Sequence, residues 1–357
     1  MKLIKTILVQ LFTGANIATL ILLWACCAVT FVSPEQHPRL ALLTYAFPFI
    51  LAFNVLFVLF WLVFKVKRVW IPIAGIALCW SFIRDYIPLN FTGKSTTELS
   101  SDSTLTILSY NSCHYGTPNA NLEDGTNAVE THLEESGADI ICLQESLNRS
   151  GLTERMEAKG YHLVNAKEFT IYSRLPILSY DTIAIPDYSC HALRAYLAYG
   201  NDTIMLINQH LQSNKLSLKM KDAYRESIKT LERDSMRKDI TPILQFLTQA
   251  SPSRAMQTDN IADEIDAWLP RPIIVCGDFN DTPISYTHRL LTRRLASAYR
   301  ESGNGLGFTF REKGFPVRID HILFNEDYWR SVETHVENDF SYSDHFPIRT
   351  KLVKKAP

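Results

Sequence analysis

The sequence predicts N-terminal transmembrane helices followed by an α/β domain with mainly antiparallel sheets. Two long runs without any charged residue open the chain, at positions 6–34 and 40–64. From Leu105 onward, short apolar segments alternate with polar turns, which is typical of strands joined by short links with helices interspersed. The 357 residues are 46% hydrophobic and 20% charged, which excludes a mainly disordered chain.

The formal charge divides the chain at about the same place. The whole protein carries 36 basic and 37 acidic residues, a net charge of −1. Seven basic and two acidic residues lie at or before Phe91, so this part has a charge of +5. The remaining 29 basic and 35 acidic residues give the rest a charge of −6. The nearly neutral total is therefore the sum of a basic N-terminal part and an acidic C-terminal part.

The two uncharged runs predict membrane-spanning helices over about 8–32 and 40–64. A bilayer core requires roughly 20 apolar residues in a helix, and both runs exceed that length. A cleaved signal peptide is the alternative for the first run, but its apolar region is long and a second run follows directly. The lipoprotein-like tetrapeptide Leu23-Trp24-Ala25-Cys26 contains a bulky Trp, which argues against lipid attachment at Cys26.

A third helix is expected over 69–89, and it decides the topology. Residues 69–83 are uncharged but too few to cross a bilayer core at about 1.5 Å per residue. The apolar character continues beyond Arg84, whose side chain can reach the membrane surface from the end of a span. The alternative for this segment is an interfacial or buried helix.

The basic residues of the N-terminal part predict its orientation. Lys2 and Lys5 precede the first span, and Lys65, Lys67 and Arg68 follow the second, so both clusters should be cytoplasmic. Three spans would then place the C-terminal domain outside the cytoplasm, whereas two spans would leave it inside. We predict three spans in a bacterial inner membrane, with the domain periplasmic or extracellular.

The chain is expected to comprise a membrane anchor over 1–89, a polar Ser- and Thr-rich linker over 90–104, and one domain over 105–353. A disulfide between Cys113 and Cys190 is left open by the sequence. Helices are expected over 126–136, 219–237 and 253–268. The expected strands cover 105–111, 138–145, 161–165, 170–173, 193–199, 203–210, 272–277, 318–324 and 347–352.

Polar residues with catalytic potential occur at the ends of these strands. Carboxylates at apolar strand ends are costly unless they meet a cation or a hydrogen-bonding partner, so a cluster of them favours a site for a hard metal ion with acid–base groups. Each residue alone has an ordinary structural interpretation, such as a turn former or a solvated strand end. The candidate residues are Asn111, Glu145, His210, Asp278, Asn280, Asp320, Asp344 and His345.

Residues from about Leu105 to Leu352 resemble the endonuclease/exonuclease/phosphatase superfamily, which has the pancreatic-deoxyribonuclease-like fold. The most specific motifs are Gly277-Asp278-Phe279-Asn280-Asp281 after an Ile/Val strand and Ser343-Asp344-His345-Phe346-Pro347 near the C-terminus. The resemblance implies two packed sheets flanked by helices, a four-layer α/β/β/α sandwich. Supporting motifs are Asn111, Leu143-Gln144-Glu145, Asn208-Gln209-His210-Leu211 and Arg318-Ile319-Asp320-His321-Ile322.

The resemblance also implies a role for each candidate residue. Glu145, Asn111 and Asp344 would hold Mg²⁺ or Mn²⁺, while Asp278 would orient or deprotonate the attacking water. Asn280 would hold water or a phosphate oxygen, and His345, oriented by Asp320, would stabilise the transition-state charge. His210 would be a second phosphate contact or the acid for the leaving group. His321 is given no catalytic role, because the family often has Tyr at this position.

The resemblance implies a metal-dependent hydrolase that attacks a phosphodiester or phosphomonoester with water. The substrate stays open between a lipid, a nucleic acid and a small molecule, and the bilayer is the expected partner of the N-terminal helices. The acidic domain argues modestly against nucleic acid, although basic residues between Lys215 and Arg233 form either a phosphate-facing patch or a solvated helix face. The alternatives are an extracytoplasmic nuclease and a non-catalytic binding module.

Overall fold

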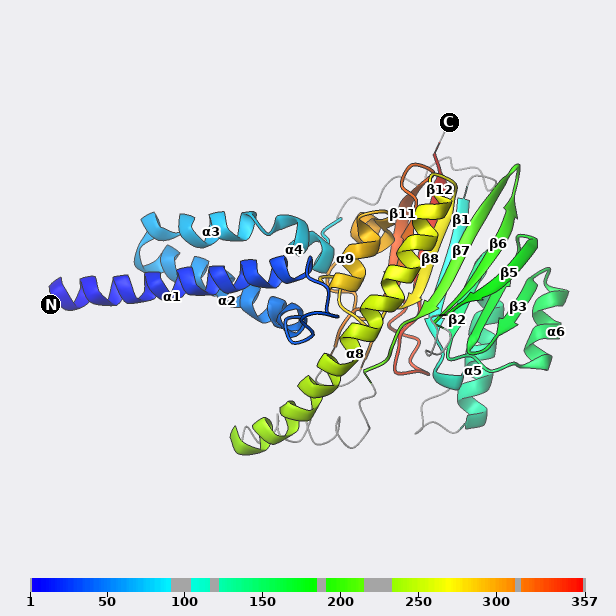
Figure 1. Ribbon diagram of the computed structural model, residues 1–357, viewed down its shortest axis with the longest axis horizontal. Helices are drawn as coiled ribbons and strands as arrows, with labels where there is room; N and C mark the ends of the chain where they lie inside the picture. The colour runs from blue at the N-terminus through cyan, green and yellow to red at the C-terminus, as the bar shows by residue number, and fades with distance from the viewer. Residues whose placement is uncertain are drawn as a thin grey trace.

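A computed structural model describes residues 2–90, 104–115, 122–184, 191–214, 233–311 and 316–355. A helical bundle formed by the N-terminal residues stands beside a layered α/β domain, and the N-terminus lies at the end of the bundle farthest from that domain (Figure 1). The predicted fold class is confirmed. Most of the expected linker, most of the expected helix over 219–237 and Cys190 lie outside the described residues, as does the basic segment from Lys215 up to residue 232.

Two helices of the bundle are long and apolar enough to cross a membrane, α1 (Lys2–Val29) and α2 (Leu42–Phe64). The expected third helix is broken rather than continuous. A short 3₁₀ turn η1 (Val66–Arg68) leads into α3 (Trp70–Ala77), and α4 (Trp80–Tyr86) follows at an angle of 65°. Taken together, this bent pair meets the length and composition of a third span.

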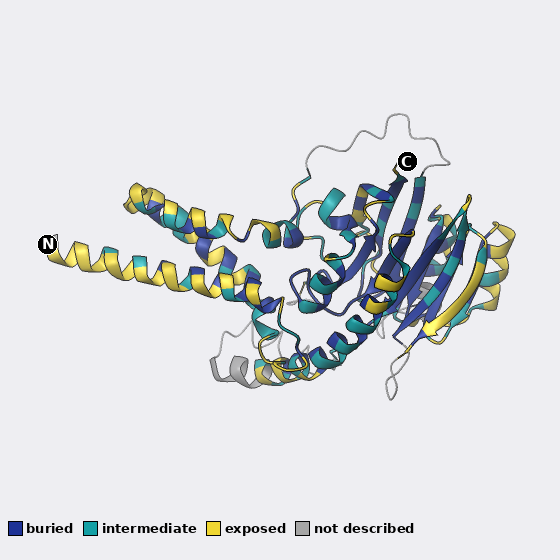
Figure 2. Ribbon diagram, turned by 45° about the horizontal axis from the view of Figure 1, so that its top comes forward, coloured by how far each residue is buried: buried dark blue, intermediate teal, exposed yellow. Residues whose placement is uncertain are grey.

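The bundle is apolar outside and partly polar inside, the reverse of a soluble protein. Its outward-facing surface is exposed along most of its length (Figure 2) and includes Leu3, Phe49 and Val63. Inside, the buried side chain of Asn16 accepts a hydrogen bond from Trp61 Nε1 at 3.1 Å. Such a distribution of polar and apolar side chains is typical of helices that pack within a lipid bilayer.

The α/β domain contains two mixed six-stranded sheets, each with four antiparallel pairings and one parallel pairing. The strand order of the first sheet is β11-β12-β1-β2-β4-β3, and β1 and β2 are its parallel pair. Its strands are β1 (Thr104–Asn111), β2 (Ile140–Gln144), β3 (His162–Ala166), β4 (Phe169–Ser173), β11 (Trp329–Val336) and β12 (Ile348–Lys354).

The second sheet repeats this plan. Its strand order is β5-β6-β7-β8-β10-β9, and β7 and β8 are its parallel pair. Its strands are β5 (Ile177–Ile183), β6 (Ala192–Tyr199), β7 (Asp202–His210), β8 (Ile273–Asp278), β9 (Ala296–Ser297) and β10 (Asp320–Phe324).

Successive side chains of the central strands point to opposite faces of each sheet, and the apolar ones form three layers. Ile107 of β1 and Ile274 of β8 belong to the core between the two sheets. Their neighbours Leu108 and Val275 point to the outer faces, where helices cover them. The helices are η3 (Cys113–Tyr115), α5 (Leu122–Glu135) and α6 (Ser150–Ala158) on the first sheet, and α8 (Arg233–Trp268) and α9 (Tyr286–Thr292) on the second. The short helix α10 (Ala298–Ser302) instead contributes Ala298 and Tyr299 to the core between the sheets.

Three strands, β5, β9 and β11, were absent from the sequence-based prediction, and each lies at the edge of a sheet. In β5 five consecutive residues are exposed, so its sequence lacks the apolar alternation by which strands are recognised. The helix expected over 253–268 is the second half of α8. The interior strands were therefore predicted more readily than the edge strands, of which β3 alone was predicted among the described residues.

Candidate active site

The topology gathers the candidate residues at one edge of the two sheets. Asn111 and His210 end strands β1 and β7, and Asp278 ends β8, which is parallel to β7. Asp320 begins β10 rather than ending a strand, and because β10 is antiparallel to β8 it pairs directly with Asp278. The loop carrying His345 likewise precedes β12, which runs antiparallel to β1. Strand starts and strand ends thus meet at the same edge.

Asp278 lies at the centre of this cluster and is almost completely buried. Its Oδ1 accepts a hydrogen bond from the backbone N–H of Asn280 at 2.7 Å, and its Oδ2 accepts one from the Asn280 side chain at 3.1 Å. Asn280 adopts a left-handed backbone conformation with φ of 51°, which Asn tolerates better than most residues. The loop therefore holds the Asp278 carboxylate in one orientation.

Gly277 allows this close arrangement. Its φ is 131°, and a Cβ atom at this position would lie 1.9 Å from the backbone oxygen of Gln209 on the neighbouring parallel strand. Any other residue would separate β7 from β8 where His210 and Asp278 pair in register. The glycine of the motif is thus required by backbone packing, and the aspartate by chemistry.

Asn111 joins two carboxylates. Its Nδ2 donates to Glu145 Oε1 and to Asp278 Oδ2, both at 3.2 Å, while its Oδ1 accepts from the backbone N–H of Cys113 at 3.1 Å. Glu145 follows β2 directly, with φ of 47°, and its side chain is partly exposed. The amide thus fixes the distance between the two acids, in an orientation where its nitrogen rather than its oxygen faces them.

His345 and Asp320 form a buried hydrogen-bonded pair. His345 Nδ1 lies 2.8 Å from Asp320 Oδ2, and His345 Nε2 points toward Asp278 Oδ2 at 3.7 Å. Burial alone would lower the pKa of His345, but the charges of Asp320 and Asp278 outweigh it and raise this pKa to about 10. His345 is therefore a cation at neutral pH.

His210 approaches the same carboxylate oxygen of Asp278 as His345 does. Its Nδ1 lies 2.9 Å from Glu168 Oε1, and its Nε2 lies 3.7 Å from both Glu145 Oε1 and Asp278 Oδ2. Burial opposes its charge, but the hydrogen bond to Glu168 and the neighbouring carboxylates raise the pKa of His210 to about 9. Burial also raises the pKa of Asp278 to about 6, against the opposing charge of His345. At neutral pH these shifts favour an ionised Asp278 carboxylate and protonated His210 and His345 rings, both with Nε2 3.7 Å from Asp278 Oδ2.

The donor set suits a hard divalent cation and a phosphate. Ligand atoms of Asp278, Asp320 and His345 all lie within 4.8 Å of one another, and Glu145 and Asn111 adjoin this group. Two buried atoms, Asp320 Oδ1 and His210 Nε2, lack a hydrogen-bond partner within the described part of the chain. Because buried polar atoms are almost always satisfied, such atoms indicate a place for a ligand. Carboxylate and amide oxygens are the ligands that Mg²⁺ prefers.

Asp344 stands somewhat apart from the other acids. It is partly exposed, and its backbone oxygen accepts from the N–H of Arg311 at 2.9 Å. Its charge helps to raise the pKa of His345, so it lies close enough to act on the site electrostatically. It does not belong to the group of Asp278, Asp320 and His345, and its assignment as a metal ligand stays a prediction.

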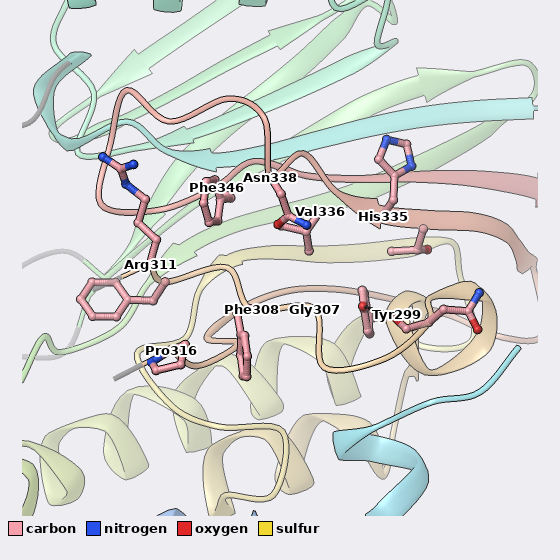
Figure 3. Close-up of a pocket in the computed structure, with 12 residues that line it drawn as sticks. Tyr299, Gly307, Phe308, Arg311, Pro316, His335, Val336, Asn338 and Phe346 are labelled. Carbon is pink, nitrogen blue, oxygen red and sulfur yellow. Dashed lines mark hydrogen bonds between the residues drawn. The ribbon is translucent and has the colours of Figure 1, made fainter. Parts of the chain in front are cut away.

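A pocket of about 580 Å³ lies next to the loop that carries His345, with Phe346 in its wall (Figure 3). The Phe310 ring packs edge-on against the His345 ring, with centroids 5.1 Å apart, and Phe310 also lines the pocket. Asn338 contributes a polar group to its wall, whereas the His335 ring points away from it. This size is typical of a pocket that receives a small molecule or part of a larger substrate.

Sequence reasoning missed three residues that shape the site. Glu168 is the partner of His210, Ser343 donates to the backbone oxygen of Asn111 at 2.8 Å and accepts from the N–H of His345 at 3.1 Å, and Arg311 lines the pocket. Ser343 was recognisable as part of its motif. Glu168 lies in a hairpin turn between β3 and β4, where a charged residue carries no functional signal. His321, in contrast, is buried against Phe279, and burial lowers its pKa well below 6.5.

Comparisons with known proteins agree with this geometry. Residues 108–345 match the Endonuclease/Exonuclease/phosphatase family, and residues 9–86 match a domain of unknown function (DUF8431). No curated protein matches the chain.

Solved structures share the fold of the α/β domain at low sequence identity. The endonuclease/exonuclease/phosphatase from Bacteroides vulgatus has a TM-score of 0.51 and 17% identity, over 71% of this chain and 100% of that chain. The human Nocturnin catalytic domain has a TM-score of 0.51 and 14% identity, over 71% and 95%. A functionally unknown conserved protein from Enterococcus faecalis has a TM-score of 0.50 and 16% identity, over 70% and 100%.

Proteins of this kind are generally divalent-metal-dependent phosphoesterases and nucleases. The motif match spans every candidate residue from Asn111 to His345, and it covers about two thirds of the chain. The chain therefore belongs to the Endonuclease/Exonuclease/phosphatase family.

Proposed function

We propose that the protein is a membrane-anchored phosphoesterase that uses Mg²⁺ or Mn²⁺ and works outside the cytoplasm. The observation that carries the proposal is the Asp278 carboxylate, buried between the imidazolium groups of His345 and His210. An anionic base between two cations can activate water while the cations bind the phosphate.

Each of these residues has a separate role in hydrolysis. Asp278, ionised at neutral pH and oriented by Asn280, accepts a proton from the attacking water. His345, held by Asp320, donates a hydrogen bond to the phosphate and stabilises the charge that develops there. His210, held by Glu168, protonates the leaving oxygen. A divalent ion at Glu145 would neutralise phosphate charge.

The arrangement of the bundle supports an extracytoplasmic site. The N-terminus lies at the end of the bundle away from the α/β domain, and η1 with Lys67 and Arg68 lies at that same end (Figure 1). The guanidinium of Arg68 lies over the Trp61 ring and donates to Thr13, which ties the second basic cluster to α1. If basic ends face the cytoplasm, the α/β domain faces the other side.

Hydrolysis of bis-(p-nitrophenyl) phosphate by the full-length protein in detergent tests the activity. The variant Asp278→Asn removes the base but keeps the shape of the side chain, and we expect about a 10²- to 10⁴-fold lower rate. Asp266→Asn is the matched control, because Asp266 is exposed and pairs only with Arg294 within the described part of the chain. Equal rates for Asp278→Asn and the wild type would refute the proposed activity.

Reporter fusions after Pro357 test the orientation. A reporter that is active only outside the cytoplasm should be active, and one that is active only inside should be silent. The opposite pattern would place the catalytic domain in the cytoplasm and would contradict the assignment of the bent pair α3–α4 as a third span.

A further inference from the structure

An apolar cavity of about 570 Å³ lies where the bundle meets the α/β domain. One wall is the beginning of α2, with Leu42, Ala46 and Phe49. The facing wall is the first half of α8, with Ile243 and Leu247, and Phe308 lines the side toward the domain. The cavity is therefore built by a membrane-spanning helix and a helix of the catalytic domain together.

The α8 helix presents two separate apolar stripes. Its second half places Ile261 and Ile265 in the core against the second sheet. Its first half repeats apolar residues at positions 240, 243, 244 and 247, which is the spacing of one helix face. All four of these residues line the cavity, and none belongs to a packed core cluster of the domain. The apolar stripe on the first half of α8 thus lines the cavity and does not pack in the core of the domain.

The position of the cavity identifies its occupant. Phe49 of α2 and Leu244 of α8 are 68% and 40% exposed, so the apolar lining continues onto the outer surface of a helix that spans the membrane. The first turns of α2 form the end of the span nearest the α/β domain (Figure 1). A hydrocarbon chain of a lipid in the adjacent leaflet can enter such a cavity without crossing water.

The cavity also adjoins the active site. Thr282, which lines it, follows Asp278 by four residues in the same loop. Tyr45 of α2 lines it too, and its hydroxyl donates to Asp281 Oδ1 at 3.3 Å. Phe308 and Pro316 line both this apolar cavity and the pocket of about 580 Å³ next to the loop that carries His345. An amphipathic ligand could therefore place its chain in one and its phosphate near the other.

We propose that the cavity binds one hydrocarbon chain of a membrane lipid, and that the phosphoester of this lipid is the substrate. The proposal rests on the proposed phosphoesterase function and names its substrate class. In the reaction, a bond forms between the water oxygen and phosphorus, and the bond from phosphorus to the alcohol oxygen breaks. The water proton passes to Asp278, and the leaving oxygen takes a proton from His210.

Binding is tested with the full-length wild-type protein in liposomes that contain a phospholipid with a diazirine in its acyl chain. After irradiation, mass spectrometry should find cross-links on cavity residues of α2 and α8, such as Ala46 and Leu247. Cross-links confined to the outward faces of α1, α2 and α3 would overturn the proposal, because any membrane helix would give them.

A pair of variants tests the link to the substrate. Ala46→Phe fills the cavity, whereas Ala52→Phe makes the same change at an exposed position of the same helix. The substrates are phosphatidylglycerol, phosphatidylethanolamine, phosphatidic acid and sphingomyelin in liposomes, with bis-(p-nitrophenyl) phosphate, DNA and RNA alongside. We expect Ala46→Phe to lower lipid hydrolysis at least tenfold and to leave bis-(p-nitrophenyl) phosphate hydrolysis within twofold. Ala52→Phe should change neither rate.

The two proposals fail in different ways. If the wild type hydrolyses bis-(p-nitrophenyl) phosphate no faster than Asp278→Asn, the phosphoesterase function fails, while the cross-linking result still stands for the cavity. The lipid proposal fails, and the phosphoesterase function remains, if the wild type hydrolyses bis-(p-nitrophenyl) phosphate but no lipid. The same holds if Ala46→Phe and Ala52→Phe hydrolyse lipid at equal rates. Preferential cleavage of DNA or RNA would also overturn the lipid proposal.

Discussion

The helical bundle and the catalytic domain both bury polar side chains, but of different kinds. In the bundle the buried groups include the neutral amides of Asn16 and Asn54, and Asn54 Nδ2 donates to the backbone oxygen of Ile50 at 2.8 Å. At the sheet edge of the α/β domain the buried groups include the ionisable side chains of Asp278, Asp320 and His345, and Asp320 Oδ1 has no hydrogen-bond partner within the described residues.

The difference distinguishes buried polar groups that stabilise the fold from buried polar groups that take part in function. Neutral amides that satisfy one another hold helices together at little electrostatic cost. Charged groups in a buried site are costly, and they persist where they meet a substrate or a cation. The bundle thus has the polarity of an anchor, whereas the sheet edge has the polarity of an active site.

The two regions are nonetheless joined through charged residues. Arg318 is buried, lies two residues before Asp320, and donates to the backbone oxygens of Asp85 and Tyr86 at the end of α4. The Asp85 carboxylate pairs with Arg300 of α10. The helical bundle is therefore packed onto the α/β domain close to Asp320, and it is not a separate tether.

The largest effect should come from making the active site resemble the bundle. Asp320→Asn replaces the carboxylate that holds His345 with a neutral amide of the same shape. We expect about a 10²- to 10³-fold lower rate on bis-(p-nitrophenyl) phosphate, because His345 loses the group that orients it and supports its charge. A rate within twofold of the wild type would show that the charge of Asp320 contributes little to catalysis. It would contradict the electrostatic difference between the two regions.

Loss of Arg318 should weaken the junction between them. Arg318→Met leaves the backbone oxygens of Leu306, Asp85 and Tyr86 without this donor. We expect the free energy of unfolding to fall by about 3 kcal/mol, since buried acceptors without donors cost about 1–3 kcal/mol each. Chemical denaturation in detergent measures this, with the exposed Arg271→Met as control. Equal losses for the two variants would mean that the junction contributes little.

A third effect depends on pH. His288 is buried, and burial together with the charges of Arg318, Arg300 and Arg289 lowers its pKa to about 3. The unfolded chain has a His pKa near 6.5, so between these values it binds a proton that the folded protein does not. The stability due to a neutral His288 is therefore complete above about pH 6.5 and is lost as the pH falls toward 3.

The pH dependence is checked by thermal denaturation between pH 7 and 4. His288→Phe removes the titrating group, so its melting temperature should fall less steeply with acid than that of the wild type. His162→Phe, at an exposed position, should follow the wild type. Identical slopes in all three proteins would contradict a buried neutral His288.

The smallest effect should come from making the bundle fully apolar. Asn54→Leu removes a hydrogen-bonding group from between α1 and α2, and such groups contribute about 0.6 kcal/mol on average in membrane proteins. We expect a loss of that order in unfolding experiments and an unchanged rate on bis-(p-nitrophenyl) phosphate. A tenfold lower rate would show that the interior of the bundle is coupled to catalysis.

Much of this arrangement could be predicted from the sequence, for physical reasons. Central strands such as β8 are apolar throughout, and Asp278 stands out at the end of such a strand. Edge strand β5 is mostly exposed, so its sequence has no comparable pattern. The contact between Arg318 and the end of α4 joins residues more than 230 positions apart, and local sequence carries no trace of it. The bend between α3 and α4 also left no signal in the apolar pattern.

The central claim, a metal-dependent phosphoesterase at this sheet edge, is tested most directly by titrating Mg²⁺ into the chelator-treated full-length protein. With bis-(p-nitrophenyl) phosphate as substrate, the rate should rise from background to a plateau, and Glu145→Gln should require at least about tenfold more Mg²⁺ for its half-maximal rate. Mn²⁺ should restore the wild-type rate in the same way. A full rate after chelation, unchanged by added Mg²⁺ or Mn²⁺, would contradict the claim.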